Sequence, residues 1–287
     1  MPPLTVVVVA YHAPKALREA LLPLATRLPL VVVDNSDDDD VRAVANDLGA
    51  TFLPAGGNLG FGRGVNLALE QAVPAGHDVL LLNPDAVIAA DDVLALQVAL
   101  HAHERRAAVS PALTGDDGTR QQVTWPFPSP REAIAVALAL RRLVRSGEDF
   151  LVGAVLLLRA EALDQVGRFD PRFFLYAEEA DWQRRARHHG WSVAEVPQVT
   201  ARHASGGTSP SSAHKETLLA AGQETFVRKW HGASGWQAYR WATVLGAVVR
   251  ALVGSSPRRS ANRWRASLYR RGPVSVAREL GLLPAPS

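Results

Sequence analysis

The chain of 287 residues contains no cysteine. This absence excludes a disulfide framework, a thiolate metal site and a cysteine nucleophile, and it fits a reducing compartment. Charged residues are also few, at 21% against 47% hydrophobic residues. A chain of this length and composition can bury a substantial core, arranged as one large domain or two.

The sequence also lacks an apolar run long enough to span a membrane. The longest run, 241–254, is shorter than the roughly 20 residues of an ordinary span, and Arg250 interrupts it. No basic segment typical of a signal peptide precedes the first strand-like run. We therefore expect a cytoplasmic protein, peripheral to the inner face of the plasma membrane if it meets a membrane.

A strong overall charge is missing too, because the formal net charge is only +3. The chain as a whole is not a polycation, and nucleic acid is not among the partners we expect. The charge is uneven, however: 37–40 is acidic, and seven arginines crowd the C-terminus, namely Arg258, Arg259, Arg263, Arg265, Arg270, Arg271 and Arg278. Such a tail binds an anionic surface or is simply a solvated helix face.

Apolar runs and helical patterns alternate in the first half of the chain. The runs typical of strands buried on both faces are Leu4–Ala10, 30–33 and 79–82, and 51–53 is expected to be a short strand. The helical patterns between and after them are 14–26, 41–48, 61–73 and 91–103, with Asp91 expected as the N-cap of the last. This alternation predicts an α/β sandwich with a mostly parallel sheet.

The second half is less regular. Its expected features, in chain order, are a hairpin turn at 114–118, a loop at 125–130, a helix at 132–144, a strand run at 150–158 interrupted by Gly153, a helix at 179–189, short strands at 193–196 and 199–203, and C-terminal helices at 213–230 and 235–253.

Several polar or glycine-rich segments follow the predicted strands. They are Ala10-Tyr11, Asp34, 56–64 and Asn83-Pro84-Asp85. Ligands bind beyond the carboxyl ends of parallel strands, so we expect these segments to form one cleft. Asp34 can accept from a ribose hydroxyl or a base N–H, or it can cap a turn. Segment 56–64 can receive an anion at a helix N-terminus, or it is a tight turn; it is neither a dinucleotide fingerprint nor a P-loop.

Two acidic sites lie far apart in the sequence. Asp85 offers a hard oxygen ligand for Mg²⁺ or Mn²⁺ on a stiff turn, and His203 is a possible second ligand. In Glu178-Glu179-Ala180-Asp181, mutual repulsion and an apolar lead-in should raise a pKa towards that of a general base. The alternatives are a common turn, a structural histidine and an acidic helix start.

Taken in order, these segments resemble the inverting family-2 glycosyltransferases with the GT-A fold. The resemblance covers roughly residues 4 to 230. Segment 58–66 is similar to the G-N-x-G-[FY]-[AG]-x-[AG]-x-N pattern that leads the donor helix, and Asn83-Pro84-Asp85 to the variant D-x-D of rhamnosyltransferase-like members. Segments 167–170 and 174–182 resemble the G-x-F-D…F-x-[ED]-[ED]-x-D-[WL] block.

The resemblance implies a fold and a division into domains. The fold is α/β, with a mostly parallel central sheet flanked by helices and followed by C-terminal helices. Residues 1–230 would form the glycosyltransferase domain, with the donor half at about 1–110 and the acceptor half at about 111–230. Residues 231–287 would form a basic helical extension that lies near a membrane or binds a partner.

The resemblance also implies roles for individual residues. Glu179 would be the general base, supported by Glu178 and Asp181, and Asp85 and His203 would bind a divalent cation, Mn²⁺ or Mg²⁺. Gly153 and Trp182 would lie at the acceptor. The residues expected at the donor are Ala10, Tyr11, Asp34, Asn58, Gly60, Asn66, Asn83 and Asp85.

Two positions depart from the family pattern. Asn83 replaces the first acid of the D-x-D motif, so the metal site has one charge fewer. The base is a glutamate where an aspartate is usual, which lengthens the side chain by one methylene.

The expected activity is transfer of a sugar from a nucleotide-diphosphate donor to a hydroxyl of a glycan or a polyprenyl-linked glycan, in cell-wall polysaccharide synthesis. Within the rhamnosyltransferase-like subgroup the donor would be dTDP-rhamnose. Two alternatives stay open. One is a sugar-phosphate nucleotidylyltransferase, although 10–13 lack the G-x-G-[ST]-R-like loop expected there. The other is a non-catalytic nucleotide-sugar-binding subunit of a glycan-assembly complex.

Overall fold

The structure is a computed structural model that describes residues 1–140, 149–204, 212–253 and 255–284. The chain forms two compact units. The first contains Met1–Trp125, Phe150–Phe174 and Glu178–Thr208, and the second contains Pro126–Asp149, Leu175–Ala177 and Ser209–Ser287. This division by contacts differs from the expected break after residue 230, because 126–149 and 175–177 belong with the C-terminal helices.

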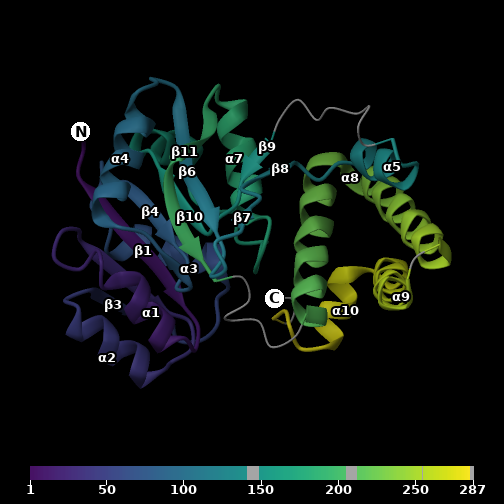
Figure 1. Cartoon of the computed structure of the whole chain (residues 1–287), viewed down its shortest axis with the longest axis horizontal. Helices are drawn as coiled ribbons and strands as arrows, with labels where there is room; N and C mark the ends of the chain where they lie inside the picture. Colours follow the sequence, from purple (N-terminus) through teal and green to yellow (C-terminus); the bar gives the residue numbers. More distant parts are fainter. Residues whose placement is uncertain (141–148, 205–211, 254, 285–287) are drawn as a thin grey trace. The chain divides into compact units, whose positions relative to one another are not determined.

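A nine-stranded sheet organises the first unit, with helices flanking it (Figure 1). Its strands are β1 (Leu4–Ala10), β2 (Leu30–Asp34), β3 (Thr51–Pro54), β4 (Asp78–Leu82), β5 (Ala86–Val87), β6 (Arg106–Thr114), β7 (Arg120–Gln121), β10 (Val155–Leu158) and β11 (Ser192–His203). The order is β3-β2-β1-β4-β10-β6-β11-β5, with β7 paired to β6. Short strands β8 (Thr124–Pro126) and β9 (Asp149–Leu151) form a separate sheet.

The pairing is parallel from β3 through β2 and β1 to β4, and again between β6 and β11. β10 runs antiparallel to both of its neighbours, and β5 runs antiparallel to β11. The mostly parallel sheet predicted from the sequence is therefore confirmed, with the antiparallel pairs contributed by the second half of the unit.

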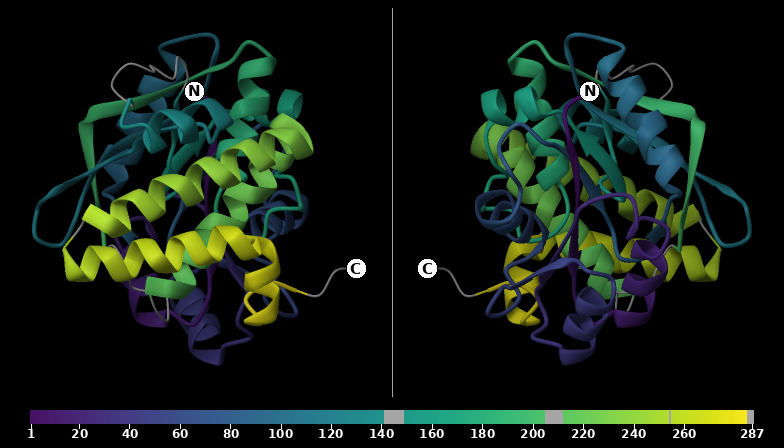
Figure 2. Two further views of the ribbon diagram at one scale, coloured as in Figure 1. Left: turned by 90° about the vertical axis from the view of Figure 1, so that its right-hand side faces the viewer. Right: turned by 90° about the vertical axis from the view of Figure 1, so that its left-hand side faces the viewer.

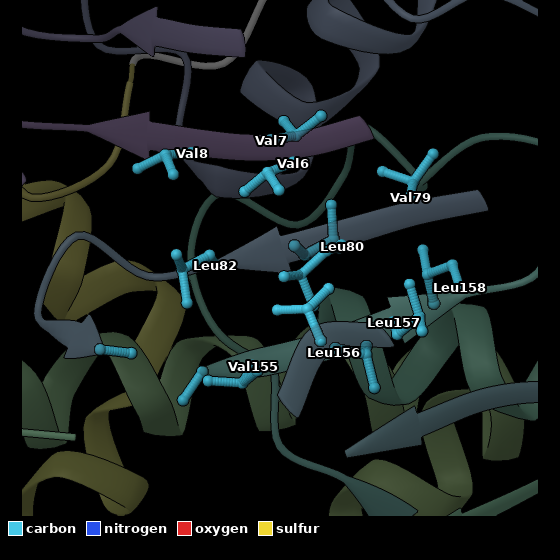
Figure 3. Packing of buried hydrophobic residues seen from close by; sticks show 14 of the residues in the cluster. Val6, Val7, Val8, Val79, Leu80, Leu82, Val155, Leu156, Leu157 and Leu158 are labelled. Carbon is cyan, nitrogen blue, oxygen red and sulfur yellow. The ribbon is translucent and has the colours of Figure 1, made fainter. Parts of the chain in front are cut away.

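The core of the first unit lies along β1, β4 and β10, whose residues are all buried. Figure 3 shows Val6 and Val8 of β1, Leu80 of β4 and Leu156 of β10 among the packed side chains. Strands buried on both faces need apolar residues at successive positions, which is why these strands were visible as continuous Val- and Leu-rich runs.

The helices of the first unit are α1 (Pro14–Leu21), α2 (Asp39–Asp47), α3 (Phe61–Gln71), α4 (Ala90–His101), α6 (Ala160–Val166) and α7 (Glu178–His188). Helix α1 ends before residue 26, where the sequence suggested its end, because Pro23 has no N–H to continue the helix. The predicted N-cap Asp91 is wrong: Ala89 occupies that position, and Asp91 pairs with Arg27 instead.

Two further differences concern the second half of the chain. The short strands predicted at 193–196 and 199–203 are one strand, β11, with an irregularity between Val196 and Thr200. The helix predicted at 132–144 is observed as α5 (Pro130–Ala137), and residues 141–144 lie outside the described residues. The hairpin turn at 114–118 is confirmed between β6 and β7.

The second unit is helical. It contains α5, α8 (Ser212–Val253), α9 (Ser256–Arg271) and α10 (Pro273–Glu279). Gly232, with φ 69°, breaks α8 between the two helices predicted for this region. The second half of α8 lies beside α9 (left view of Figure 2).

Aromatic packing holds the helices of the second unit together. The core includes Trp236 and Tyr269, and both Tyr239 and Tyr269 donate hydrogen bonds to Gln223 Oε1. Burial raises the pKa of Tyr239 to about 12, so its hydroxyl keeps its proton at neutral pH. Among the residues that the structure describes, no helix combines the length and hydropathy needed to cross a membrane.

Candidate active site

The carboxyl ends of β1, β2 and β4 lie at one edge of the sheet, as parallel registers require. Ala10 is buried at the end of β1, and its carbonyl accepts from Asn35 N at 2.9 Å. Tyr11 follows with 44% of its surface exposed. The backbone of the first strand end is therefore fixed, while an aromatic ring next to it is open to a ligand.

The carboxylate of Asp34, at the end of β2, accepts hydrogen bonds from the turn that follows it. Oδ1 accepts from Ser36 N at 2.8 Å and from Ser36 Oγ at 2.6 Å, and Oδ2 accepts from Asp38 N at 2.9 Å. The residue is only 2% exposed. These contacts belong to a turn-forming aspartate. Contact between Asp34 and a nucleotide stays a prediction.

The glycines at the start of α3 allow close packing against other parts of the same unit. Gly60 has φ 81°, and a Cβ there would lie 2.0 Å from Phe174 O. A Cβ on Gly62 would lie 3.4 Å from Glu178 Cβ, which is an ordinary contact at the close end of the range. Asn58 Oδ1 accepts from Gly60 N at 3.0 Å and so fixes the entry to the helix. The glycine pattern thus brings α3 against the acidic segment.

Asn66, expected at the donor, holds another segment of the protein. Its Nδ2 donates to Phe169 O at 2.8 Å, and its Oδ1 accepts from Phe169 N at 2.9 Å. Both polar atoms of the amide are therefore used on one backbone position. The contacts support a positioning role for Asn66, which connects the two motifs that carry the family resemblance.

Strand pairing brings Asp85 and His203 together, although they are far apart in sequence. Asp85 lies between β4 and β5, and β5 pairs with the end of β11 so that Ala86 is opposite His203. Ala204 N also donates to Asp85 O at 3.0 Å. As a result, His203 Nε2 lies 3.5 Å from Asp85 Oδ1, with the two side chains 20% and 10% exposed.

Gln121, on β7, contacts His203 at two points. Its Nε2 donates to His203 O at 2.8 Å, which leaves its Oε1 facing His203 Nδ1 at 2.9 Å. An amide oxygen only accepts, so in the neutral ring the proton is on Nδ1 and the lone pair is on Nε2. That lone pair faces the carboxylate of Asp85. The sequence analysis missed Gln121, because the pairing of β6 with β11 that places it there is non-local.

Two acceptor atoms facing each other at this distance fit a cation between them. A second buried acid on β4 is the contrast: Asp78 accepts from Gln97 Nε2, His101 Nε2 and Ala160 N. For Asp85, His203 is the only side-chain partner that an interaction among the described residues gives it. No group of three or more metal-ligating side chains occurs in the described part of the chain. Two protein ligands suit a cation that a diphosphate completes.

The loop between β9 and β10 links this pair to the acidic segment. Asn83 N donates to Ala154 O at 2.9 Å. On the other side, a Cβ on Gly153 would lie 3.7 Å from Glu179 Cβ and Cγ and 3.9 Å from its Cδ. The side chain of Glu179 therefore runs along Gly153, and the next residue, Ala154, is hydrogen-bonded to the turn that carries Asp85.

Glu178 and Glu179 differ in environment. Glu178 is 4% exposed against Gly62, and burial, followed by the charge of Glu179, raises its pKa well above the ordinary value. The raised pKa expected for this cluster is therefore found on Glu178.

Asp181 and Trp182 were also predicted near the reaction, but their contacts are typical of residues that stabilise the fold. Asp181 is fully buried and pairs with Arg185 Nε at 3.1 Å. Trp182, expected at the acceptor, is also fully buried: it donates from Nε1 to Gly167 O at 2.9 Å and stacks on Phe169. This position does not support acceptor contact. The W of the motif belongs to the core beneath the site.

Backbone strain precedes the acidic segment. Tyr176 and Ala177 have φ values of 69° and 71°, a region that costs L-residues energy. Such strain persists only where surrounding structure enforces it, and it concentrates at functional sites.

A sheet of this order, with a His–Asp pair at the strand ends and a carboxylate helix start beside it, is that of the GT-A nucleotide-sugar transferases. The chain belongs to the family described as "Glycosyltransferase like family 2", which it matches over residues 2–221. The protein is therefore a glycosyltransferase, and the predicted family and fold are confirmed.

Relatives are found among rhamnosyltransferases. The chain is 31% identical to the N-acetylglucosaminyl-diphospho-decaprenol L-rhamnosyltransferase of Mycobacterium tuberculosis, over 91% of this chain and 96% of that protein. It is 26% identical to rhamnosyltransferase WbbL of Escherichia coli, over 61% and 72% of the two chains. Among solved structures, the mannosyltransferase PcManGT of Pyrobaculum calidifontis, in complex with GDP-Man and Mn²⁺, has the same fold, with a TM-score of 0.60 at 19% identity, covering 96% of this chain and 82% of that one.

Proposed function

We propose that this chain is an inverting, divalent-cation-dependent rhamnosyltransferase of cell-envelope polysaccharide synthesis. It transfers L-rhamnose from dTDP-rhamnose to a hydroxyl of polyprenyl-diphosphate-linked N-acetylglucosamine at the inner face of the plasma membrane. The observation that carries this proposal is the link through Gly153 and Ala154 between Glu179 and the Asn83-Pro84-Asp85 turn. The mycobacterial relative supports the sugar and the acceptor, and the dTDP carrier rests on the family resemblance.

The donor nucleotide lies at the ends of β1 and β2. Tyr11 has the exposed ring on which a base can stack, and Ala10 fixes the backbone beneath it. Asp34 orders the turn that borders this position, and Asn58 and Gly60 order the loop that follows β3.

The diphosphate lies at the end of β4. Asp85 and His203 Nε2 would hold a divalent cation, Mn²⁺ or Mg²⁺, beside the donor diphosphate. When bound, the cation offsets the charge that develops on the departing diphosphate. Asn83 provides a neutral amide where the family pattern has an acid, so less protein charge opposes the incoming diphosphate.

Glu179 is the general base. It removes the proton from the acceptor hydroxyl as that oxygen attacks the anomeric carbon, on the face opposite the diphosphate. The bond from the anomeric carbon to the diphosphate oxygen breaks, its electron pair leaves with the nucleoside diphosphate, and the configuration inverts. The raised pKa of Glu178 favours its neutral form, which limits charge repulsion beside Glu179. Gly153 leaves room next to the base for the acceptor.

The test is a reaction of the full chain with dTDP-rhamnose, Mn²⁺ and polyprenyl-diphosphate N-acetylglucosamine, followed by mass spectrometry and NMR of the product. We expect a rhamnosylated product of inverted configuration, and none with GDP-mannose or UDP-glucose as donor. Asp85→Ala should abolish the Mn²⁺ enhancement of dTDP binding in calorimetry. Unchanged metal dependence in that variant would reject the cation site.

Glu179→Gln tests the base separately. It keeps size and hydrogen bonding but removes basicity, so kcat should fall by roughly 10²–10⁴-fold while dTDP affinity stays unchanged. Glu161→Gln, at an exposed carboxylate on α6, is the control and should retain activity. Near-normal turnover of Glu179→Gln would mean that another acid is the general base. Metal-dependent dTDP binding by the wild type without turnover of any acceptor would favour the non-catalytic subunit.

A further inference from the structure

The second half of α8 presents an apolar face that no other part of the described chain covers. We call it the apolar stripe; its members are 44–80% exposed and recur at the spacing of one helix face: Trp241, Leu245, Val248, Val249, Leu252 and Val253. The opposite face, with Trp236, Ala247 and Ala251, is buried within the unit. Single exposed apolar residues are ordinary, but six on one face mark a contact surface.

The sequence around the stripe is strongly and uniformly basic. From residue 233 to residue 271 there are eight arginines and not one aspartate or glutamate. Helix α9 carries most of these arginines and packs beside the second half of α8 (Figure 2). An apolar face next to concentrated positive charge is the pattern of helices that lie in an anionic membrane interface.

Apolar and charged residues border the same groove between α8 and α9. The groove has a volume of about 320 Å³ and is lined by Val248 and Leu252 from α8 and by Arg263 and Arg270 from α9. We call these two arginines the arginine rim. Within the described residues no ion pair reaches either guanidinium, so both are available to an anionic group.

Helix α5 adds apolar surface on the other flank of α8. A Cβ on Gly246 would lie 3.1 Å from Ala137 Cα, so the two helices touch closely there. Beyond that contact, Leu138 and Leu140 are 56% and 44% exposed. The apolar stripe thus lies between the arginine-bearing helix α9 and helix α5, which is followed by these two exposed leucines.

Charge decides between the possible occupants of this face. Glu216 and Glu279 pair with Arg265 and Arg271, but a second copy packed stripe to stripe would still place the other arginines of 233–271 against one another. Insertion across a bilayer is not supported by any helix of the described chain. An anionic phospholipid surface suits both the apolar stripe and the arginine rim, because acyl chains can pack on the stripe and anionic headgroups can pair with the arginines.

We propose that the apolar stripe and the arginine rim dock this chain on an anionic phospholipid surface. The inference deepens the proposed function, because it names the surface on which a lipid-linked acceptor is met. Vesicle binding is measured without donor or acceptor, so failure to dock and failure to transfer rhamnose are separate results.

The test is co-sedimentation of the full chain with vesicles of phosphatidylcholine, with and without 30% phosphatidylglycerol, at 50 and 500 mM NaCl. We expect binding to the anionic vesicles that weakens at least tenfold at high salt, since salt screens the arginines. Brominated lipid should quench tryptophan fluorescence, and Trp241→Phe should remove part of that quenching.

Variants separate the two components. Leu245→Glu/Leu252→Glu should abolish vesicle binding, while Leu22→Glu, at a 62% exposed leucine of the first unit, should leave it unchanged. Arg263→Gln/Arg270→Gln should weaken binding by about 25-fold, or about fivefold for each arginine. Thermal unfolding of each variant checks that the fold is retained.

Four results would overturn the proposal. One is a wild type that ignores anionic vesicles at low salt, and another is a folded stripe variant that binds as the wild type does. The third is a wild-type dimer in light scattering that the stripe variant converts to a monomer without any vesicle binding, because the stripe would then be a subunit interface. Binding only to an acidic protein, and to no vesicle, would equally reject the lipid surface.

Discussion

Gln121 determines which nitrogen of His203 faces Asp85, through hydrogen bonds of 2.8 and 2.9 Å to the backbone carbonyl and to Nδ1. Without it, the imidazole can turn or present a protonated Nε2 to the cation site. We predict that Gln121→Ala weakens Mn²⁺ binding in the presence of dTDP by about 10–100-fold, the usual effect of removing a group that orients a metal ligand. Electron paramagnetic resonance of free Mn²⁺ measures this without turnover.

The next residue provides the control for this experiment. Gln122 is exposed and donates to Thr124 O, on the same short segment but away from His203. Gln122→Ala should bind Mn²⁺ as the wild type does. Equal affinities for both alanine variants would mean that Gln121 has no part in orienting His203.

Glu178 makes stability depend on pH in a defined direction. Its pKa is raised above the ordinary value of 4.5, so the folded state keeps the proton after the unfolded state has lost it. Above pH 4.5 the folded state therefore loses stability as pH rises, until pH passes the raised pKa, by up to about 1.4 kcal/mol per pH unit. We predict that Glu178→Gln gains melting temperature relative to the wild type as pH rises from 4.5 to 8.

Differential scanning fluorimetry across this pH range measures the difference in melting temperature. Glu70→Gln, at an exposed carboxylate on α3, is the matched control and should show no such trend. A Glu178→Gln difference that stays constant with pH would show that the pKa of Glu178 is not raised in the folded protein.

At the scale of elements, the start of α3 is fixed by steric fit to the segment before the acids. Gly60 combines φ 81° with a position where a Cβ would meet Phe174 O at 2.0 Å, while Gly56 has φ 71° and nothing within 4 Å. Gly56→Ala should cost about 1–2 kcal/mol for backbone strain alone. Gly60→Ala should cost about 2–5 kcal/mol, because overlap adds to strain.

Urea unfolding gives both free energies, and Gly56→Ala serves as the control that carries the strain without the overlap. Gly60→Ala should also lower activity more than Gly56→Ala does, since Phe174 leads into Glu178 and Glu179. Equal losses of stability would imply that the loop moves aside freely and that Gly60 matters only for its φ.

The sequence predicted the elements well where the determining signal was local. Strands β1, β2 and β4 are continuous apolar runs because both faces of the sheet are covered there, and the break in α8 falls between the two helical patterns. The prediction of Asp91 as N-cap was wrong because a capping residue one or two positions either way gives nearly the same pattern. The resemblance predicts roles for Asp85, His203 and Glu179, but not what surrounds them.

What the sequence could not give depends on non-local pairing. His203 reaches Asp85 only because β5 pairs with β11, and Gln121 reaches His203 only because β6, which carries β7 beside it, pairs with β11. Burial is equally non-local: Trp182 belongs to the core, and the raised pKa is on Glu178 because Gly62 of α3 packs on it. No periodicity within a short window contains this information.

At the scale of the whole molecule, the net charge is modest, but basic and acidic residues are strongly separated along the sequence. The chain has 31 basic and 28 acidic residues, and 233–271 holds eight of the basic residues and none of the acidic ones. The remainder therefore has 23 basic against 28 acidic residues, so +8 in one segment is balanced by −5 elsewhere. A basic segment on an otherwise acidic chain favours one orientation towards an anionic surface.

This separation predicts how activity responds to salt. We consider an acceptor whose long polyprenyl chain is embedded in anionic vesicles. For this acceptor, kcat/KM should fall at least tenfold between 50 and 500 mM NaCl. The Debye length shortens from about 14 to about 4 Å, which weakens the attraction between the arginines and the anionic headgroups. With a water-soluble, short-chain acceptor the same salt change should alter kcat/KM far less, since the active site is unchanged. Leu245→Glu/Leu252→Glu should match the wild type on the soluble acceptor and lose activity on the embedded one at low salt. Identical salt curves for the two acceptors would argue that lipid-linked substrate reaches Glu179 without docking through the apolar stripe.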